Sequence, residues 1–356
     1  MATRPPMVRL TSLSHGAGCA CKLSLEELTS VLDGVTWPTH PDLLVGLATR
    51  DDAAVWRQSD DRALIATTDF FTPLVDDPKH WGQIAAANAV SDVYAMGATP
   101  RFALNILGWP RDLSFELLQE VLKGAAEVAA TAGYVIAGGH TIDSAEPIFG
   151  QVVIGDAPID GLLTNAGALP GQAIVLTKPL GTGIVTTALK RSEPFPDDVD
   201  EPLAVAYRAA IASMTRLNDQ AARTASEVGA TAATDVTGFG LLGHLHRLLS
   251  ASGVAADLDA DVVPLLPHVG ALLEVGNVPG GTVRNAEQAA AYLSSTIAEE
   301  QRLILADAQT SGGLLFTCES RDAVQAVDEL TASGHQAAMI GTVRDGASGT
   351  ITVHGA

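Results

Sequence analysis

The chain has 356 residues, a length typical of about two domains. Hydrophobic residues make up 47% and aromatic residues only 4%, so Ala, Val, Leu and Gly fill most of the core, which favours layered α/β packing over an aromatic-rich β-sandwich. The formal net charge of −20 argues against sequence-independent binding to nucleic acid or anionic membranes, so a polyanionic substrate must be held by local cations or a bound metal.

The first ten residues, MATRPPMVRL, contain two arginines but no apolar segment behind them, so they do not read as a signal peptide. No window approaches the roughly 18 apolar residues of a membrane span. Three cysteines in the whole chain do not make a disulfide framework. We therefore expect a reducing, cytoplasmic location.

Residues 1–22 lack apolar periodicity and predict a mobile arm. Ser24 and Glu27 form a capping-box pattern that begins a short helix ending near Leu32. The following patterns predict strands at 43–46, 53–56, 64–70, 103–109, 134–139 and 149–155, with helices at 81–96 and 115–132. Strands that alternate with helices indicate an α/β architecture, with mixed sheets allowed.

A turn-rich stretch at 156–171 predicts a domain boundary, giving an arm at 1–22, an N-terminal domain at 23–158 and a C-terminal domain at 159–356. The second domain is expected to begin with a strand, a glycine turn and a helix over 172–183. An acidic, Pro-rich loop follows at 191–202. The remaining patterns predict helices at 203–228 and 322–333 and strands at 337–342 and 350–354. The stretch 234–249 predicts a turn that opens a helix, and 308–317 predicts a glycine turn that leads into a strand.

The stretch HGAGCACK, residues 15–22, has the wrong spacing for a phosphate-binding loop or a dinucleotide fingerprint. Cys19, Cys21 and His15 supply only three of the four ligands a zinc site needs. A disulfide between the two cysteines would close a very small, strained ring. The remaining interpretations are a reactive thiol at Cys19, with Lys22 stabilising a thiolate, or a flexible tail with incidental cysteines.

Four aspartates, Asp52, Asp69, Asp92 and Asp235, lie at strand ends or beside glycine turns. Each alone is more typical of a cap or a turn, but together they suggest metal-bridged phosphate binding, because Mg²⁺ prefers oxygen ligands. Cys318 is interpreted as a buried thiol. His244 and His246 are interpreted as structural, because residues two apart face different sides of a helix.

Several glycine turns flank regular segments: GGHT at 138–141, GTG at 181–183, TGFG at 237–240 and SGG at 311–313. Turns of this kind can offer backbone N–H groups to oxyanions. Ordinary strand-to-helix connections use glycine equally often, so both interpretations stay open.

Taken together, the sequence resembles the selenophosphate synthetase (selenide, water dikinase) family over nearly its whole length. The resemblance is carried by LTSLSHGAGCACK, LLVGLATRDDAAV, TTDFFTPLVDDP, AAANAVSDVYAMGATP, ILGWP, AGGHTID, EPIFG, LTKPLGTG, TDVTGFGLLGH, VPGGTVRN and DAQTSGG. Ala308 in the last stretch departs from the proline usual in the family. The wider superfamily of aminoimidazole-ribotide synthetase-like ATP enzymes shares the Asp and Gly pattern, whereas the Cys-x-Cys-Lys arm marks the selenium branch.

The resemblance implies a two-domain aminoimidazole-ribotide synthetase-like fold, in which an N-terminal sheet domain forms a dimeric β-barrel and a C-terminal α/β layer covers the site. It implies that ATP, selenide and water give selenophosphate, AMP and orthophosphate, supplying activated selenium for selenocysteine and selenouridine. Cys19 would be the active-site thiol and Lys22 its partner on the phosphates. Mg²⁺ would be held by Asp52, Asp92 and Asp235. The nucleotide site implied by the resemblance comprises Lys22, Thr49, Arg50, Asp51, Asp69, Asp92, Gly139, His140 and Thr141.

The resemblance further implies a homodimer, a K⁺ requirement with no ligands indicated, and a selenium-delivery protein as a partner. One alternative is a superfamily kinase or synthetase acting on a small amide or thiamine-type substrate, but such enzymes lack the Cys-x-Cys-Lys pattern. The other alternative is a non-catalytic metal or selenium carrier that uses Cys19, Cys21 and His15. That alternative leaves the four aspartates unexplained.

Overall fold

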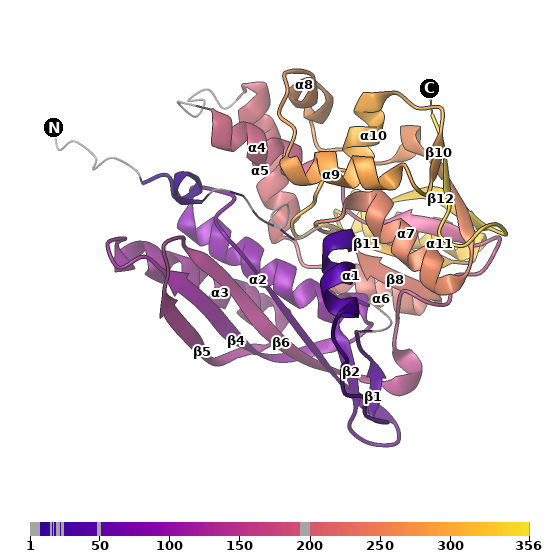
Figure 1. Cartoon of the computed structure of the whole chain (residues 1–356), viewed down its shortest axis with the longest axis horizontal. Helices are drawn as coiled ribbons and strands as arrows, with labels where there is room; N and C mark the ends of the chain where they lie inside the picture. The colour runs from indigo at the N-terminus through magenta and orange to yellow at the C-terminus, as the bar shows by residue number, and fades with distance from the viewer. Residues whose placement is uncertain are drawn as a thin grey trace.

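The computed structural model describes residues 8–14, 16, 18, 22, 25–47, 51–192 and 200–355. Two sheets organise this part of the chain, one built from residues before the expected boundary and one from residues after it (Figure 1). No helix within the described ranges has the length and apolar character to cross a membrane.

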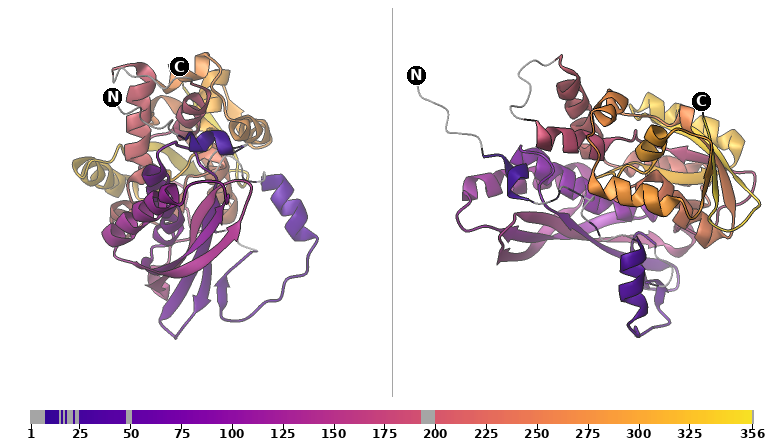
Figure 2. Two further views of the ribbon diagram at one scale, coloured as in Figure 1. Left: turned by 90° about the vertical axis from the view of Figure 1, so that its left-hand side faces the viewer. Right: turned by 45° about the horizontal axis from the view of Figure 1, so that its top comes forward.

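The first sheet has six strands in the order β1-β2-β3-β6-β4-β5. Its pairings are antiparallel except for β4 with β5. The strands are β1 (Leu43–Val45), β2 (Ala54–Arg57), β3 (Arg62–Phe71), β4 (Thr99–Trp109), β5 (Val135–Asp143) and β6 (Ile148–Pro158). Helices α2 (Pro78–Ala95) and α3 (Phe115–Ala132) lie on the same side of this sheet, and α1 (Leu25–Asp33) stands apart beside it (Figure 2).

Strand β3 shows how one face of this sheet is covered and the other is left open. Ala63 and Ile65 are fully buried, whereas residues that alternate with them are partly or largely exposed. Because successive side chains of a strand point to opposite faces, the buried set faces α2 and the exposed set faces away. The open face is therefore formed by the second set.

Helix α2 connects the two halves of the molecule. Asp77 caps its first turn by accepting a hydrogen bond from the His80 N–H, and Pro78 takes the first helical position, so the helix begins three residues before the predicted start. Most of its residues are buried, because it packs against the first sheet on one side and against elements of the second domain on the other. This position carries Asp92 to the junction between the domains.

The second sheet has seven strands in the order β10-β13-β9-β12-β7-β11-β8. They are β7 (Ala173–Leu176), β8 (Ala232–Asp235), β9 (Ala255–Asp259), β10 (Leu293–Ser295), β11 (Leu314–Cys318), β12 (Ala338–Arg344) and β13 (Ile351–His354). Strand β7 is buried on both faces: Val175 belongs to the core shared with the first domain, and Ile174 belongs to the core beneath α7 (Gly240–Ser252). The remaining helices are α4 (Thr182–Arg191), α5 (Pro202–Thr215), α6 (Asp219–Glu227), α8 (Val269–Glu274), α9 (Gly280–Ala289), α10 (Glu299–Leu305) and α11 (Ser320–Ala332).

The single helix predicted over 203–228 is wrong, because the chain breaks it between α5 and α6. Arg216 is extended there, and its freed carbonyl accepts a hydrogen bond from the buried Lys178 Nζ at 2.7 Å. The break also places the Asn218 amide in the interior, where it donates to Ser91 Oγ and to the Gly312 carbonyl, each at 2.8 Å. Polar contacts across the domain junction therefore override helix propensity at this point.

Cys318 is buried in β11 as a free thiol, as predicted. Helices α8, α9 and α10 and strands β8, β9 and β10 were not predicted from the sequence. Each of these elements is short, and none carries a long periodic pattern.

Candidate functional site

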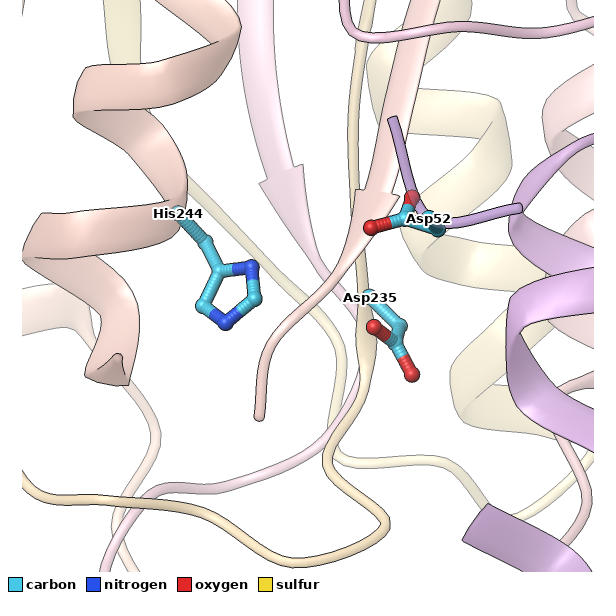
Figure 3. A group of neighbouring side chains, drawn as sticks. All are labelled: Asp52, Asp235 and His244. Atoms are coloured by element: carbon cyan, nitrogen blue, oxygen red, sulfur yellow. The ribbon is translucent and has the colours of Figure 1, made fainter. Parts of the chain in front are cut away.

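The predicted acidic residues converge where the two domains meet. Asp69 lies on β3, Asp92 on α2 and Asp235 at the end of β8, while Asp52 lies just before β2. One ligand atom from each of Asp52, Asp235 and His244 lies within 4.8 Å of the others (Figure 3). We call Asp52, Asp69, Asp92 and Asp235 the acidic cluster.

Neutral hydroxyl groups hold three of these carboxylates in place. Thr67 donates a hydrogen bond to Asp92, Ser91 donates one to Asp235 (2.7 Å), and Thr234 donates one to Asp52 Oδ1 (2.9 Å). The second oxygen of Asp52, Oδ2, is buried and has no hydrogen-bond partner among the described residues. A hydroxyl orients a carboxylate but adds no positive charge, so the geometry leaves the cluster open to a cation.

Electrostatics support the same conclusion. Burial has the largest effect on the pKa of Asp52 and repulsion from Asp235 the next largest, and together they raise this pKa to about 8. Burial raises the pKa of Asp235 to about 6, although the Ser91 hydrogen bond and the charge of Lys22 oppose this. Burial and the neighbouring Asp235 and Asp69 also raise the pKa of Asp92. A hard divalent cation with oxygen ligands would replace these protons, so the donor set fits Mg²⁺.

The raised pKa values predict how stability depends on pH. A carboxyl whose folded pKa lies above its unfolded value stabilises the fold fully at low pH, and this stability is lost as the pH rises through the folded pKa. For Asp235 and Asp52 the loss extends from about pH 4 to about pH 6 and pH 8 respectively. We expect Mg²⁺ to raise the melting temperature of the chelator-treated protein more at pH 8 than at pH 5. Thermal melts with EDTA and with Mg²⁺ test this, and an equal Mg²⁺ effect at both pH values would contradict it.

Lys22 brings the predicted arm into this site. Its Nζ donates to Asp69 Oδ2 at 2.9 Å, and Asn88 of α2 donates to the same oxygen at 2.7 Å. Asp69 is buried, whereas the Lys22 side chain is 38% exposed. The lysine therefore lies at the rim of the acidic cluster.

The beginning of the arm is docked on the body of the protein. Residues Leu10–Leu13 form a single 3₁₀ turn, with Leu10 and Thr11 buried. Asp76 accepts hydrogen bonds from Arg9 Nε at 3.1 Å and from the hydroxyl of Thr11 at 2.7 Å. Lys190 Nζ donates to the carbonyls of Ser14 (2.6 Å) and Gly16 (2.9 Å). The predicted thiol Cys19, together with His15 and Cys21, lies outside the described residues.

The predicted nucleotide residues are divided between two places. Asp51 accepts a hydrogen bond from the Asn165 N–H at 2.6 Å near the acidic cluster, and Thr49 and Arg50 lie outside the described residues. Gly139, His140 and Thr141 lie on the exposed edge strand β5.

The strand register shows how far apart these two groups are. Asp69 pairs with Gln151, Gln151 with Asn105, and Asn105 with Gly139, which is one row across four strands. Three strand spacings correspond to roughly 14 Å. Gly139 is required in this row, because a Cβ there would lie 2.2 Å from the Asn105 carbonyl oxygen. One protomer therefore does not bring Gly139, His140 and Thr141 onto the acidic cluster.

The GTG turn at 181–183 is not a free oxyanion site. Gln309 Oε1 accepts from the N–H groups of Gly181 and Thr182, each at 3.1 Å. Asp307 Oδ2 accepts from the Gly183 N–H at 3.0 Å. The oxyanion interpretation is wrong for this turn, because the DAQTSGG segment supplies its acceptors.

His244 was interpreted from the sequence as structural only. Its Nε2 does accept a structural hydrogen bond from the Thr237 N–H at 3.1 Å, and burial lowers its pKa well below the usual range. The neutral ring therefore carries its proton on Nδ1, which suits it to donate to a carboxylate rather than to bind a metal. Its place beside Asp52 and Asp235 was missed, although TDVTGFGLLGH sets it nine residues after Asp235 in the first turns of α7.

Known proteins match both domains of the chain. Family models described as the AIR synthase related protein N-terminal domain and C-terminal domain match residues 50–157 and 170–354. The selenide, water dikinase of Myxococcus xanthus is 46% identical over 349 residues, which covers 96% of both chains. That of Photorhabdus laumondii is 47% identical over 336 residues, covering 92% of this chain and 94% of its own.

Solved structures share the fold at lower identity. Thiamine monophosphate kinase from Aquifex aeolicus superposes with a TM-score of 0.61 at 18% identity, covering 93% of this chain and 98% of its own. The hydrogenase maturation protein HypE in complex with ATP gives a TM-score of 0.61 at 19% identity, covering 98% of this chain and 95% of its own.

Proposed function

The chain belongs to the selenide, water dikinase family of phosphotransferases, and we propose that it makes selenophosphate from selenide, ATP and water, releasing AMP and orthophosphate. The observation that supports this proposal is the ion pair between Lys22 and Asp69, because it puts the lysine of the Cys-x-Cys-Lys pattern against the acidic cluster. The superfamily kinase alternative provides the cluster but not this arm.

Asp52, Asp92 and Asp235 are the residues that would hold Mg²⁺ in this proposal. Bound there, Mg²⁺ supplies charge neutralisation for the phosphates of ATP. Ser91, Thr67 and Thr234 keep the three carboxylates oriented toward it. Phosphoryl transfer depends on positioning and charge neutralisation more than on covalent chemistry, so preoriented carboxylates are the main contribution of the protein.

The arm contributes the two groups that distinguish this chemistry. Lys22 contacts the phosphates from the rim of the cluster, and Cys19 handles selenium rather than receiving phosphate. The contacts of Arg9 and Thr11 with Asp76, and of Ser14 and Gly16 with Lys190, keep the arm close to the site. A closed arm also keeps the reacting phosphoryl group away from water.

This assignment predicts a specific loss in Cys19→Ser. The variant should lose selenide-dependent formation of AMP while it binds ATP nearly as well as the parent, because a thiolate is replaced without removing phosphate contacts. Anaerobic reactions analysed by nucleotide chromatography, together with an ATP-binding titration, measure both properties. Cys318→Ala is the matched control, because that thiol is buried in β11. Loss of ATP binding in Cys19→Ser would argue against its role in handling selenium, and ADP formed without selenide would favour a superfamily kinase.

A homodimer would complete the nucleotide site. Trp56, Phe70, Phe102 and Leu104 lie on the open face of the first sheet, and each is at least 38% exposed. A second copy packed on this face would bury them and form a shared barrel. It would also offer the partner's edge strand β5 to the acidic cluster, which one protomer cannot do alone.

Phe70→Glu is therefore expected to shift the protein from dimer to monomer and to weaken ATP binding. A carboxylate buried without a partner in the interface costs several kcal/mol. Analytical ultracentrifugation across a range of protein concentrations measures the oligomeric state. Phe115→Glu is the control, because Phe115 is 65% exposed on α3, away from this face. A parent protein that remains monomeric at high concentration would contradict the dimer.

A further inference from the structure

Gly16 of the arm lines a cavity that is separate from the acidic cluster. It has a volume of about 630 Å³ and is roofed by Gly16, while α4 and the start of α9 form its walls. None of the four aspartates of the cluster lines it. The segment VPGGTVRN, which has no role in the chemistry proposed above, supplies one wall from Val278 to Arg284.

The charge of this cavity is opposite to that of the protein. Its lining includes Lys190, Arg191 and Arg284, and no Asp or Glu is among the described residues that line it. The formal net charge of the chain is −20, so three cations in the described lining of one cavity are an unusual concentration of positive charge. The buried carboxylate of Asp307, which precedes Ala308 of the lining, accepts hydrogen bonds from Gly183, Thr282 and Gln309.

The backbone adds donors to these cations. Helix α9 begins at the cavity with Gly280 and Gly281, and no side chain caps its N-terminus. The first N–H groups of a helix and its dipole both attract anions. Thr187 and Thr310 add hydroxyl groups to the lining. Cations, N–H groups and hydroxyls together are the donor set that binds a tetrahedral oxyanion.

Lys190 connects this cavity to the arm. Lys190 lines the cavity, and its Nζ also donates hydrogen bonds to the carbonyls of Ser14 and Gly16. An oxyanion in the cavity would compete with those carbonyls for the same donor. Occupancy would therefore loosen the arm, which carries Lys22.

We propose that this cavity is a binding site for a phosphate-class oxyanion, outside the acidic cluster, through which orthophosphate or selenophosphate leaves. The identity of the occupant rests on the function proposed above, because that reaction releases both oxyanions beside the arm. Binding of phosphate itself does not depend on that function.

The test is equilibrium binding of radiolabelled inorganic phosphate to the full chain, with EDTA present and nucleotide absent, so that metal-bridged binding at the acidic cluster is eliminated. We expect saturable binding that Arg284→Gln weakens about tenfold and that Arg284→Lys partly restores. Asp52→Asn, in the acidic cluster, and Arg321→Gln, on α11, should bind phosphate like the parent. Arg321 controls for the loss of one positive charge, because its side chain is 85% exposed away from the cavity.

No saturable binding by the parent, or a loss in Asp52→Asn as large as that in Arg284→Gln, would overturn the proposal. Thiophosphate, a stable analogue of selenophosphate, identifies the source: stronger displacement by thiophosphate than by unlabelled phosphate assigns selenophosphate, and the reverse assigns orthophosphate. Failure of selenophosphate synthesis would leave the phosphate result standing, so the two proposals fail separately.

Discussion

Asp235→Asn is expected to lower Mg²⁺-dependent turnover by at least about 100-fold while raising the melting temperature of the metal-free protein. The two effects share one cause. Asp235 is 1% exposed, and burial and neighbouring carboxylates disfavour its charge. The negative charge at this position therefore lowers the stability of the fold. The amide keeps the shape and still accepts from Ser91, but it removes the charge that a metal requires.

The stability gain should be about 3 kcal/mol at pH 8, because the pKa of Asp235 is raised from 3.8 to about 6 and one unit of pKa shift corresponds to about 1.4 kcal/mol. For a domain of this size that is a rise of several degrees. Asp257→Asn is the matched control, since Asp257 is partly exposed and paired with Arg344 at 2.8 Å. Asp257→Asn should change neither the Mg²⁺-dependent turnover nor the melting temperature. Turnover close to that of the parent in Asp235→Asn would remove this residue from the metal site.

Lys22→Gln should lower kcat by about 10²–10³-fold while changing the KM for ATP much less. The reason is that a cation at the rim of the cluster stabilises charge that develops on the phosphates during transfer. The glutamine is polar but uncharged and one atom shorter than the lysine. The arm should remain docked through the contacts of Arg9, Thr11 and Lys190, which do not involve Lys22.

Steady-state kinetics on Lys22→Gln and Lys22→Arg separate charge from shape, with the arginine variant retaining part of the rate. Lys79→Gln serves as the control, because Lys79 is exposed on α2 and paired with Glu127 at 2.7 Å. An unchanged rate in Lys22→Gln would show that the lysine only anchors the arm.

Much of the architecture could be predicted from local patterns. Helix α3 agrees with its prediction at both ends, since Ser114 caps its start and Gly133 ends it in the left-handed region. The break between α5 and α6 could not be predicted, because it depends on contacts of Asn218 with Ser91 and Gly312, which are distant in sequence.

The site residues also divide into those that local patterns predict and those that depend on contacts distant in sequence. The grouping of the aspartates was predictable, because four carboxylates at strand ends and glycine turns together suggest a shared site, although each alone is typical of a cap or a turn. The occupied GTG turn was not, because its acceptors, Asp307 and Gln309, are more than 120 residues away. The place of His244 was also missed, because the sequence gives the face of a helix but not the element packed against it.

The most direct test of the central claim is phosphorus NMR of an anaerobic mixture of the protein, MgATP and ⁷⁷Se-labelled selenide. The account predicts a phosphorus resonance split by coupling to selenium, together with AMP and orthophosphate in equal amounts. Turnover of ATP to ADP and orthophosphate with no phosphorus–selenium species would contradict it and identify a kinase with a different acceptor.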